Sequence, residues 1–571
     1  MNRLVVFVVS SIIFSAISAC DLMKDVTYVV TPNPLELKGD NLEFSVDVTI
    51  PEKGISKKVR AELAPTLGST TLGTWEIQGE KVTGNGTSIS FQSGGVAKFD
   101  MKIPYTPDME AADLVVSGKV FKGKKEKSKE AIASIKIADA TIITPLLVNR
   151  AFKTITIPDK LERKVQKVIE AKINFARGKF EIRPNEMKDA DIVEMLNWVK
   201  KNQKNPKIEI NSIEIKGYAS PDGEELKNTD LSKNRAEAGK NAIIGVFKKE
   251  KIALLSNASK YTTSQFGEDF EGFKKQLALS KTIDDNYKAL FIRAVEMQGT
   301  ADQKEQMLKD LGKSYENLEK EVFPAIRRTV IVLTYTETGL TDDELRTRAV
   351  SSPSSLTVEE LLFTAEKLIT NVNDKVALYS TGIQMYAADP RVQNNSGVAL
   401  FLNSKFGDAL AAFEKANQIN PDPVTSNNLA ASAMINGDRA DARKLITQAR
   451  KNVSAENSAD MAYNAAILDL LDGNYPAAVS GFSGASFNKA LSEVLSGKLE
   501  LARTTLKQVS ADAMTNYLSA IIAARSGESV DAVVNHLKNA FAMNPNLKSK
   551  ASKDREFLKF MKDQTFTSAV N

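Results

Sequence analysis

The chain has 571 residues, a length that predicts three or four domains rather than one. Its 76 Lys and Arg residues against 71 Asp and Glu give a net charge of only +5, which argues against the concentrated basic surface of a nucleic-acid-binding protein. Hydrophobic residues make up 42% of the chain and charged residues 26%, a composition that predicts folded domains.

Cysteine and histidine are almost absent, since the chain has one of each, Cys20 and His536. No disulfide can form within the chain, and zinc sites and Ser-His or Cys-His nucleophile pairs lack their components. We therefore expect no metal, no cofactor and no catalytic residue. His536 follows a helical pattern, in which a surface or packed imidazole is the ordinary case.

Residues 1–19 have the pattern of a signal peptide, with Arg3 followed by an apolar run of 14 residues over positions 4–17. The sequence Ile17-Ser18-Ala19-Cys20 resembles the bacterial lipobox. That resemblance implies cleavage before Cys20 and lipidation of Cys20, which would anchor the mature chain to the outer membrane with most of it in the periplasm. An ordinary signal peptide with an incidental cysteine is the alternative.

Residues 20–150 are predicted to form an antiparallel β-sandwich. Apolar and polar residues alternate over positions 42–48, and positions 114–120 and 133–137 look similar. Glycine-containing turn signals separate these strands, as expected for short strands in a sandwich. The charged run at 122–130 is predicted to be a solvated hairpin tip.

Residues 151–338 alternate between helical and strand patterns, which predicts an α/β sandwich. Leu161, Val165, Val168 and Ile169 share one helical face, and a strand is expected to begin at Ile173. A second helix is expected around 192–199. Two strand patterns, 208–210 and 213–215, are out of phase, which predicts a bulge at Asn211-Ser212.

The strand then leads into Gly217-Tyr218-Ala219-Ser220, a loop with Gly223, and Asn228-Thr-Asp-Leu231-Ser232-Lys-Asn-Arg235-Ala236 at the start of a helix that is expected to run to about Lys249. These elements resemble the OmpA-like peptidoglycan-binding domain. Upstream, Ile173-Asn174-Phe175 fits the first strand of that family, and downstream Arg327-Arg328 fits its closing strand. The resemblance covers about 170 residues.

This resemblance implies that the loop and the first turns of the helix bind the free carboxylate and ammonium of a peptidoglycan stem-peptide residue, usually diaminopimelate. A guanidinium suits the carboxylate, so Arg235 would be its clamp, while Asn228 and Ser232 would order the loop. Ser220 replaces the acidic residue of the family, and Asp222 is the nearby substitute. The residues that the resemblance assigns to binding are Tyr218, Ser220, Asp222, Asn228, Leu231, Ser232 and Arg235.

The stretch between Arg235 and Arg327 is far longer than one helix and one turn require, and a helical insertion is predicted over about 268–322. This elaboration resembles the form of the domain found in lipoproteins of Bacteroidota. A pair of catalytic carboxylates, as in glycosidases, is the enzymatic alternative for Glu268, Asp269 and Glu271. At a helix start we interpret these residues as caps and dipole partners.

Residues 339–571 are predicted to form a helical repeat array, because a small residue and an alanine five positions later recur at intervals of 33, 36, 24 and 30 residues. Asn395, Asn428 and Asn464 recur at 33 and 36. These features resemble tetratricopeptide repeats, in which small residues allow close helix crossing and the stacked repeats expose a surface for a protein partner. The packing pairs begin at Ser404/Ala409 and continue as Gly437/Ala442, Gly473/Ala478, Gly497/Ala502 and Gly527/Ala532.

Together these patterns predict a non-enzymatic envelope lipoprotein that tethers the outer membrane to peptidoglycan and presents its repeats to another envelope protein. The alternative is a scaffold or assembly subunit of an outer-membrane complex, in which the OmpA-like domain no longer binds peptidoglycan. Ser220 favours the alternative, whereas Arg235 and Asn228 favour the tether.

Overall fold

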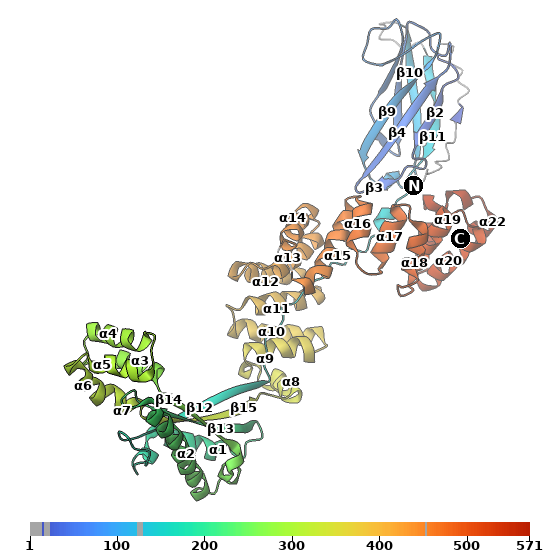
Figure 1. Ribbon diagram of the computed structural model, residues 1–571. Helices are drawn as coiled ribbons and strands as arrows, with labels where there is room; N and C mark the ends of the chain where they lie inside the picture. Colours follow the sequence, from blue (N-terminus) through green and yellow to red (C-terminus); the bar gives the residue numbers. More distant parts are fainter. Residues whose placement is uncertain (1–13, 16–22, 123–129, 452–453) are drawn as a thin grey trace. The chain divides into compact units, whose positions relative to one another are not determined.

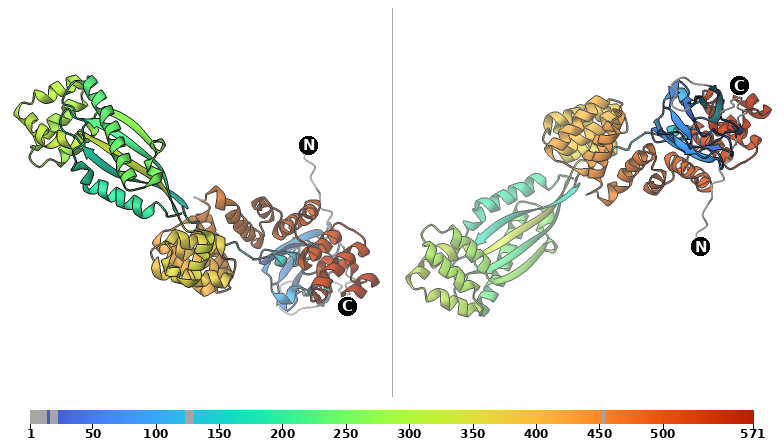
Figure 2. Two further views of the ribbon diagram at one scale, coloured as in Figure 1. Left: turned by 90° about the horizontal axis from the view of Figure 1, so that it is seen from below. Right: turned by 90° about the horizontal axis from the view of Figure 1, so that it is seen from above.

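The computed structural model describes residues 14–15, 23–122, 130–451 and 454–571 (Figures 1 and 2). The chain divides into an outer unit, Met1–Pro158 with Ala365–Asn571, and an inserted unit, Asp159–Thr364. The sequence-based boundaries, after residues 150 and 338, differ from this division. Cys20 and most of the predicted signal peptide and of the charged run at 122–130 lie outside the described residues.

Two mostly antiparallel sheets form the N-terminal part of the outer unit, and their inward side chains share one hydrophobic core. The strands expected over 42–48, 114–120 and 133–137 are confirmed within β4, β10 and β11. The first sheet contains β1 (Phe14–Ser15), β2 (Thr27–Thr31), β3 (Leu37–Lys38), β4 (Asn41–Ile50) and β9 (Gly95–Pro104). The second contains β5 (Val59–Leu67), β6 (Thr70–Thr71), β7 (Trp75–Gly79), β8 (Thr87–Ile89), β10 (Asp113–Lys122) and β11 (Glu130–Asp139).

The inserted unit is built on a four-stranded sheet of order β12-β15-β13-β14, with one face covered by two helices. Strands β13 and β14 are parallel, whereas the other pairs are antiparallel. The predicted bulge is confirmed by a register shift between Ile210 and Ser212. The elements are β12 (Lys164–Asn174), α1 (Ala190–Asn202), β13 (Ile208–Ala219), α2 (Glu225–Lys249), β14 (Tyr261–Glu268) and β15 (Arg328–Thr338).

The helix expected from Leu161, Val165, Val168 and Ile169 is wrong, because these residues approach or lie in β12, which pairs with β15 along its whole length. Ala171 and Ile173 are buried in the core and Ile169 packs against it, whereas the Val168 side chain is 57% exposed. The side chains of this segment therefore alternate between the two faces of the sheet with the period of two of a strand, and the helical spacing of its apolar residues is coincidental.

The predicted helical insertion is confirmed, and it has a hydrophobic core of its own around Phe273, Phe291 and Phe323. Its helices are α3 (Phe270–Leu279), α4 (Asp285–Glu296), α5 (Ala301–Lys309), α6 (Lys313–Asn317) and α7 (Phe323–Ile326). Two helices follow β15, α8 (Asp342–Ser351) and α9 (Val358–Phe363).

The repetitive helices that the sequence predicts are confirmed in the outer unit, where successive helices pack in pairs (Figure 1). After α10 (Val372–Met385), the first helix of each pair is α11 (Pro390–Leu402), α13 (Pro423–Ile435), α15 (Ala455–Leu471), α17 (Phe487–Leu495) or α19 (Ala513–Arg525). The second is α12 (Phe406–Ile419), α14 (Arg439–Ala449), α16 (Tyr475–Gly481), α18 (Leu499–Leu506) or α20 (Val530–Met543). The short helices α21 (Leu547–Ala551) and α22 (Gln564–Val570) end the chain.

The predicted packing pairs divide into two roles. Gly437, Gly473, Gly497 and Gly527 lie in the turns between paired helices with φ between +73° and +80°, a conformation that favours glycine. A Cβ added at Gly437 or Gly527 would meet no atom within 4 Å, so helix crossing is not the reason for glycine there. The alanines supply the close packing: Ala409, Ala442, Ala478 and Ala502 are fully buried, and Ala532 is partly buried.

Polar contacts also join the β-sheets to the repeats within the outer unit. The Tyr475 hydroxyl donates to the Leu37 carbonyl at 3.3 Å, and Arg439 forms an ion pair with Asp40 at 2.8 Å. Among the helices of the described ranges, none is both long and apolar enough to cross a membrane.

Candidate functional site

The predicted binding loop follows β13 and precedes α2, and glycine is required where the two elements meet. A Cβ on Gly217 would lie 1.9 Å from the Ser232 carbonyl oxygen, so only glycine lets α2 pack this closely on the strand. Gly217 therefore faces α2. Because consecutive strand residues face opposite sides of a sheet, the Tyr218 side chain lies on the other face, where it stacks on Phe266 at 5.0 Å.

Arg235, the predicted carboxylate clamp, is 1% exposed and hydrogen-bonded to main chain. Its guanidinium donates to the carbonyls of Lys179 at 3.0 Å, Tyr218 at 2.9 Å and Ala176 at 3.3 Å. Burial, together with the charge of Arg327, lowers the Arg235 pKa to about 10, so the side chain stays charged at neutral pH. In the structure Arg235 holds the loop after β12 against the end of β13.

Ser220 and Asp222 form a network with two arginines. The Arg327 guanidinium donates to the Ser220 hydroxyl at 3.0 Å and to the Asp222 carboxylate at 2.7 Å. Arg177 forms a second ion pair with Asp222 at 3.1 Å, and Ser220 donates its hydroxyl to the same carboxylate. The Asp222 side chain is 3% exposed. Asp222 is thus an internal counter-ion of Arg327 and shares Arg177 with Glu319, which lies 2.8 Å from that guanidinium.

Asn228 connects this loop to the end of β14. Its amide nitrogen lies 3.2 Å from the carbonyl oxygens of Ser220 and Gly223 and 2.8 Å from the Glu268 carboxylate. Ser232, one turn further along α2, accepts from the Gly267 N–H at 3.1 Å and is fully buried. Leu231 is partly buried beside it. Asn228 and Ser232 therefore order both the loop and the end of β14.

Glu268 is the acidic residue that the sequence interpretation misplaced as a helix cap. Burial, together with the nearby carboxylates of Glu305, Asp302 and Glu225, raises the Glu268 pKa to about 7, although the hydrogen bond from Asn228 opposes this shift. Its second oxygen is buried and has no hydrogen-bond partner among the described residues. A buried carboxylate with a free oxygen is suited to accept a cation or a donor.

The neighbours of Glu268 behave as the sequence predicts. Asp269 caps α3 by accepting from the Gly272 N–H at 2.7 Å and pairs with Arg328 at 2.6 Å. Glu271 is exposed and pairs with Lys274. Glu268 is the last residue of β14, which is parallel to β13, and parallel strands end at the same edge of a sheet. A strand pattern that ends at Glu268 was therefore the signal that could have placed it beside the loop.

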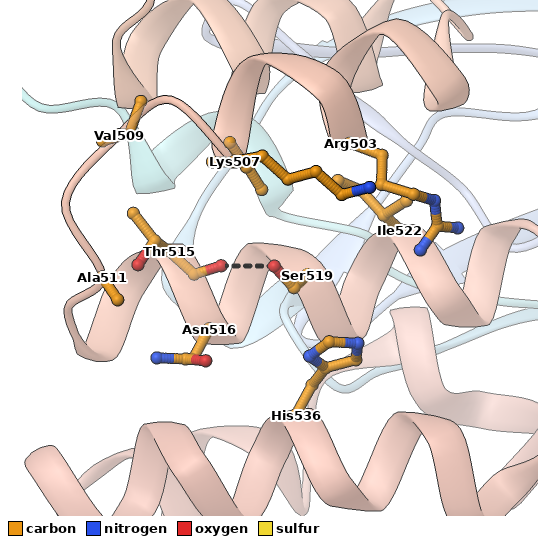
Figure 3. A pocket seen from close by; sticks show the side chains of 10 residues that line it. Arg503, Lys507, Val509, Ala511, Thr515, Asn516, Ser519, Ile522 and His536 are labelled. Atoms are coloured by element: carbon orange, nitrogen blue, oxygen red, sulfur yellow. Dashed lines mark hydrogen bonds between the residues drawn. The ribbon is translucent and has the colours of Figure 1, made fainter.

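The pocket around His536 lies between α18, α19 and α20 (Figure 3). Burial lowers the pKa of His536 from its usual 6.5, so the imidazole is neutral at pH 7. The Ser519 hydroxyl donates to the Thr515 carbonyl at 2.8 Å, and no hydrogen bond to His536 is present among the side chains drawn. Arg503 is paired with Glu528 at 2.6 Å. This arrangement gives no activated serine.

Metal ligands are not gathered anywhere in the part of the chain that the structure describes: no three His, Cys, Asp or Glu side chains form a group that holds a metal. The lipidation site predicted at Cys20 lies outside that part.

No protein-family model and no curated protein matches the sequence. Similar solved structures include a tetratricopeptide repeat protein from Parabacteroides merdae, with 13% identity, a TM-score of 0.26, and coverage of 48% of this chain and 100% of that one. A chain of the APC/C hetero-tetramer Cut9–Hcn1 has 13% identity, a TM-score of 0.23, and coverage of 60% and 75%. PilF of Pseudomonas aeruginosa has 14% identity, a TM-score of 0.20, and coverage of 52% and 98%. Because these TM-scores are low, the assignment of a repeat architecture rests on the helices of this chain and not on these similarities.

Proposed function

We propose that the protein is a non-enzymatic lipoprotein of the bacterial envelope. Lipid on Cys20 anchors it to the outer membrane, the inserted unit binds peptidoglycan as an OmpA-like domain, and the helical repeats serve as a scaffold for protein contacts. The sequence Gly217-Tyr-Ala-Ser with Asn228, Ser232 and Arg235 supports the assignment of the inserted unit.

One observation carries the wall-binding part of this proposal: opposite charges lie on the two sides of Asn228. The Ser220 side has the guanidinium groups of Arg177, Arg235 and Arg327 against two carboxylates, Asp222 and Glu319. The other side has Glu268 with a free carboxylate oxygen. The free end of diaminopimelate carries a carboxylate and an ammonium group, so it matches both charges, with Glu268 replacing the missing acidic residue at position 220.

The proposal is tested by co-sedimentation of residues 21–571 with purified sacculi. We expect wild type to bind and Glu268→Gln, which keeps the size of the side chain, to bind at least tenfold more weakly, because a charge-assisted hydrogen bond contributes about 1.5–3 kcal/mol. Glu271→Gln is the matched control, since Glu271 is exposed and paired on the adjacent helix. Equal loss in both variants would contradict the role of Glu268, and absence of wild-type binding would contradict the tether.

The second candidate is a scaffold or assembly subunit whose inserted unit does not bind peptidoglycan. It is favoured by the saturation of Asp222 with two arginines and by the three main-chain contacts of Arg235. In this case wild type does not co-sediment with sacculi, and Ser220→Asp, which restores the acidic residue of the family, regains binding. A folded Ser220→Asp variant that also fails to bind would mean that the partner of the inserted unit is not peptidoglycan.

A further inference from the structure

Residues 149–157, here called the strap, connect the β-sheets to the inserted unit and lie along the first helices of four repeat pairs (Figure 1). Each of these helices contributes one asparagine that both donates to and accepts from the main chain of a single strap residue. The pairs are Asn488 with Asn149, Asn464 with Lys153, Asn428 with Ile155, and Asn395 with Ile157, and all eight hydrogen bonds measure 2.7–2.8 Å.

Two neighbouring asparagines extend this set, which we call the asparagine ladder. Asn427 donates to the Lys153 carbonyl at 3.0 Å, and Asn394 donates to the Ile155 carbonyl at 3.1 Å. Asn427 also accepts from Asn464 at 2.8 Å, so the asparagines of the ladder, its rungs, are linked from one helix to the next. The carbonyls of Lys153 and Ile155 thus each accept two hydrogen bonds.

The chemistry of the ladder fits main chain rather than side chains. A carboxamide presents one acceptor and two donors, which match the N–H and C=O of a single extended residue. The asparagines of the ladder have no exposed surface. Because buried amides are costly without partners, these side chains require a chain segment in this position.

Side-chain contacts fix the register of the strap. Phe152 joins the core of the repeats, and Ile155 packs against Val424 and Met461; both strap residues are 8% exposed. In contrast, the Lys153 side chain is half exposed and reaches Asp460 at 2.5 Å. Main-chain bonds therefore supply most of the polar contacts, and two apolar anchors supply the selectivity.

The positions of the ladder follow the repeat period. Each of the four asparagines that bond both the N–H and the C=O of one strap residue lies nine residues before the turn residue of its repeat, as Asn395 does before Ser404 and Asn488 before Gly497. The fifth equivalent position is Leu518, which is fully buried in the apolar core. The rungs are therefore confined to the four repeats that contact the strap.

We propose that the asparagine ladder is a binding site for an extended polypeptide, which it binds through main-chain groups, and that its occupant in the intact chain is the strap. The strap is an intramolecular ligand that connects the β-sheets to one end of the repeats. A protein partner of the repeats consequently binds them away from the ladder. This inference is independent of wall binding by the inserted unit.

The first test is hydrogen exchange of the intact protein at single-residue resolution. The N–H groups of Lys153 and Ile155 are bonded to the ladder, whereas those of Thr154 and Thr156 have no partner among the described residues. We expect exchange at least tenfold slower at the two bonded positions than at the two threonines. Uniform exchange over 153–156, fast or slow, would overturn the proposal.

The second test blocks the strap within the full chain. Lys153→Pro, Ile155→Pro and Ile157→Pro together remove three ladder-bound N–H groups while keeping an extended backbone. We expect this variant to bind a fluorescent peptide of residues 147–159 at least tenfold more tightly than wild type does, as measured by anisotropy. The matched control, Thr154→Pro with Thr156→Pro, should resemble wild type.

Two results of the peptide experiment would overturn the proposal: wild type binding the peptide as tightly as the blocked variant, or a folded blocked variant binding no peptide. Adding Asn428→Ala and Asn464→Ala to the blocked variant should abolish capture, and unchanged capture would equally contradict the ladder. If the blocked variant does not fold, the exchange experiment on the intact protein decides. Co-sedimentation with sacculi should be the same for wild type and the threonine control.

Discussion

The asparagine ladder of the outer unit and the charged loop of the inserted unit achieve order in opposite ways. The ladder uses neutral amides, each paired with main chain. The loop uses arginines and carboxylates, some paired with each other and one, Glu268, left with a free oxygen. Neutral amides make a site that does not titrate and binds main-chain groups, whereas charged groups make one that depends on pH and selects its ligand by charge.

The largest expected effect is on stability, from Arg235→Ala. The sequence alone predicts that this variant loses wall binding and keeps its fold. The structure instead leads us to expect a loss of at least about 3 kcal/mol of unfolding free energy in the inserted unit, because three carbonyls lose their donor at about 1–3 kcal/mol each. Chemical denaturation measures this loss.

Arg346→Ala is the control for Arg235→Ala, since Arg346 is half exposed and forms its ion pair with Asp343 on the same helix. A stable Arg235→Ala protein that has lost only its affinity for sacculi would restore the interpretation of Arg235 as a ligand clamp.

The next effect concerns the ladder. Asn428→Ala removes the acceptor of the Ile155 N–H and one of the two donors to the Ile155 carbonyl, and is expected to lower the unfolding free energy of the outer unit by about 2 kcal/mol. Asn436→Ala, at the exposed residue that follows the same helix, should change stability by less than about 0.5 kcal/mol. Equal denaturation midpoints for the two variants would show that the ladder contributes no stability.

A smaller effect distinguishes the two regions by pH. The folded Glu268 pKa of about 7 lies above its ordinary 4.5, so the folded inserted unit binds the extra proton. Its stability should therefore decrease as pH rises from about 4.5 to 7 and then remain level. Glu268→Gln should flatten this slope in denaturation experiments at pH 5 and 7.5. In contrast, the hydrogen-exchange protection factors of the strap N–H groups should be the same at the two pH values. An unchanged slope in the variant would assign the titration to another group.

The smallest effect is expected for Lys153→Ala. The Lys153–Asp460 ion pair is 49% and 42% exposed at its two ends, so its loss should cost less than about 1 kcal/mol. Main-chain bonding at Lys153 is unaffected by the substitution. A loss comparable to that of Asn428→Ala would mean that the strap is held by its side chains.

Sequence patterns predicted the elements with strong periodicity and missed contacts between distant parts of the chain. The repeat spacing identified Asn395, Asn428 and Asn464, and the interval of 24 residues leads to Asn488, but nothing in that pattern names a ligand. The strap is too short to show a period, and its partners lie 238–339 positions away.

In the inserted unit, the motif residues placed the loop correctly between a strand and a helix, with α2 starting three residues before the predicted Asn228. Glu268 was missed because strand β14 was not predicted, and without a parallel neighbour for β13 its end could not be brought beside the loop. The helical spacing around Val165 was a coincidence that only the pairing with β15 resolves.

The path of the strap fixes an order of events during synthesis. The chain emerges from its N-terminal end, both from the ribosome and in the export that we propose, so the strap appears before any asparagine of the ladder and the whole inserted unit emerges between them. Asn395 is the first rung to appear and Asn488 the last, so capture runs backwards along the strap, from Ile157 towards Asn149. Capture therefore begins at the C-terminal end of the strap and finishes at its N-terminal end. A chain of which only the residues up to the end of α13 have emerged would hold the strap from Lys153 to Ile157.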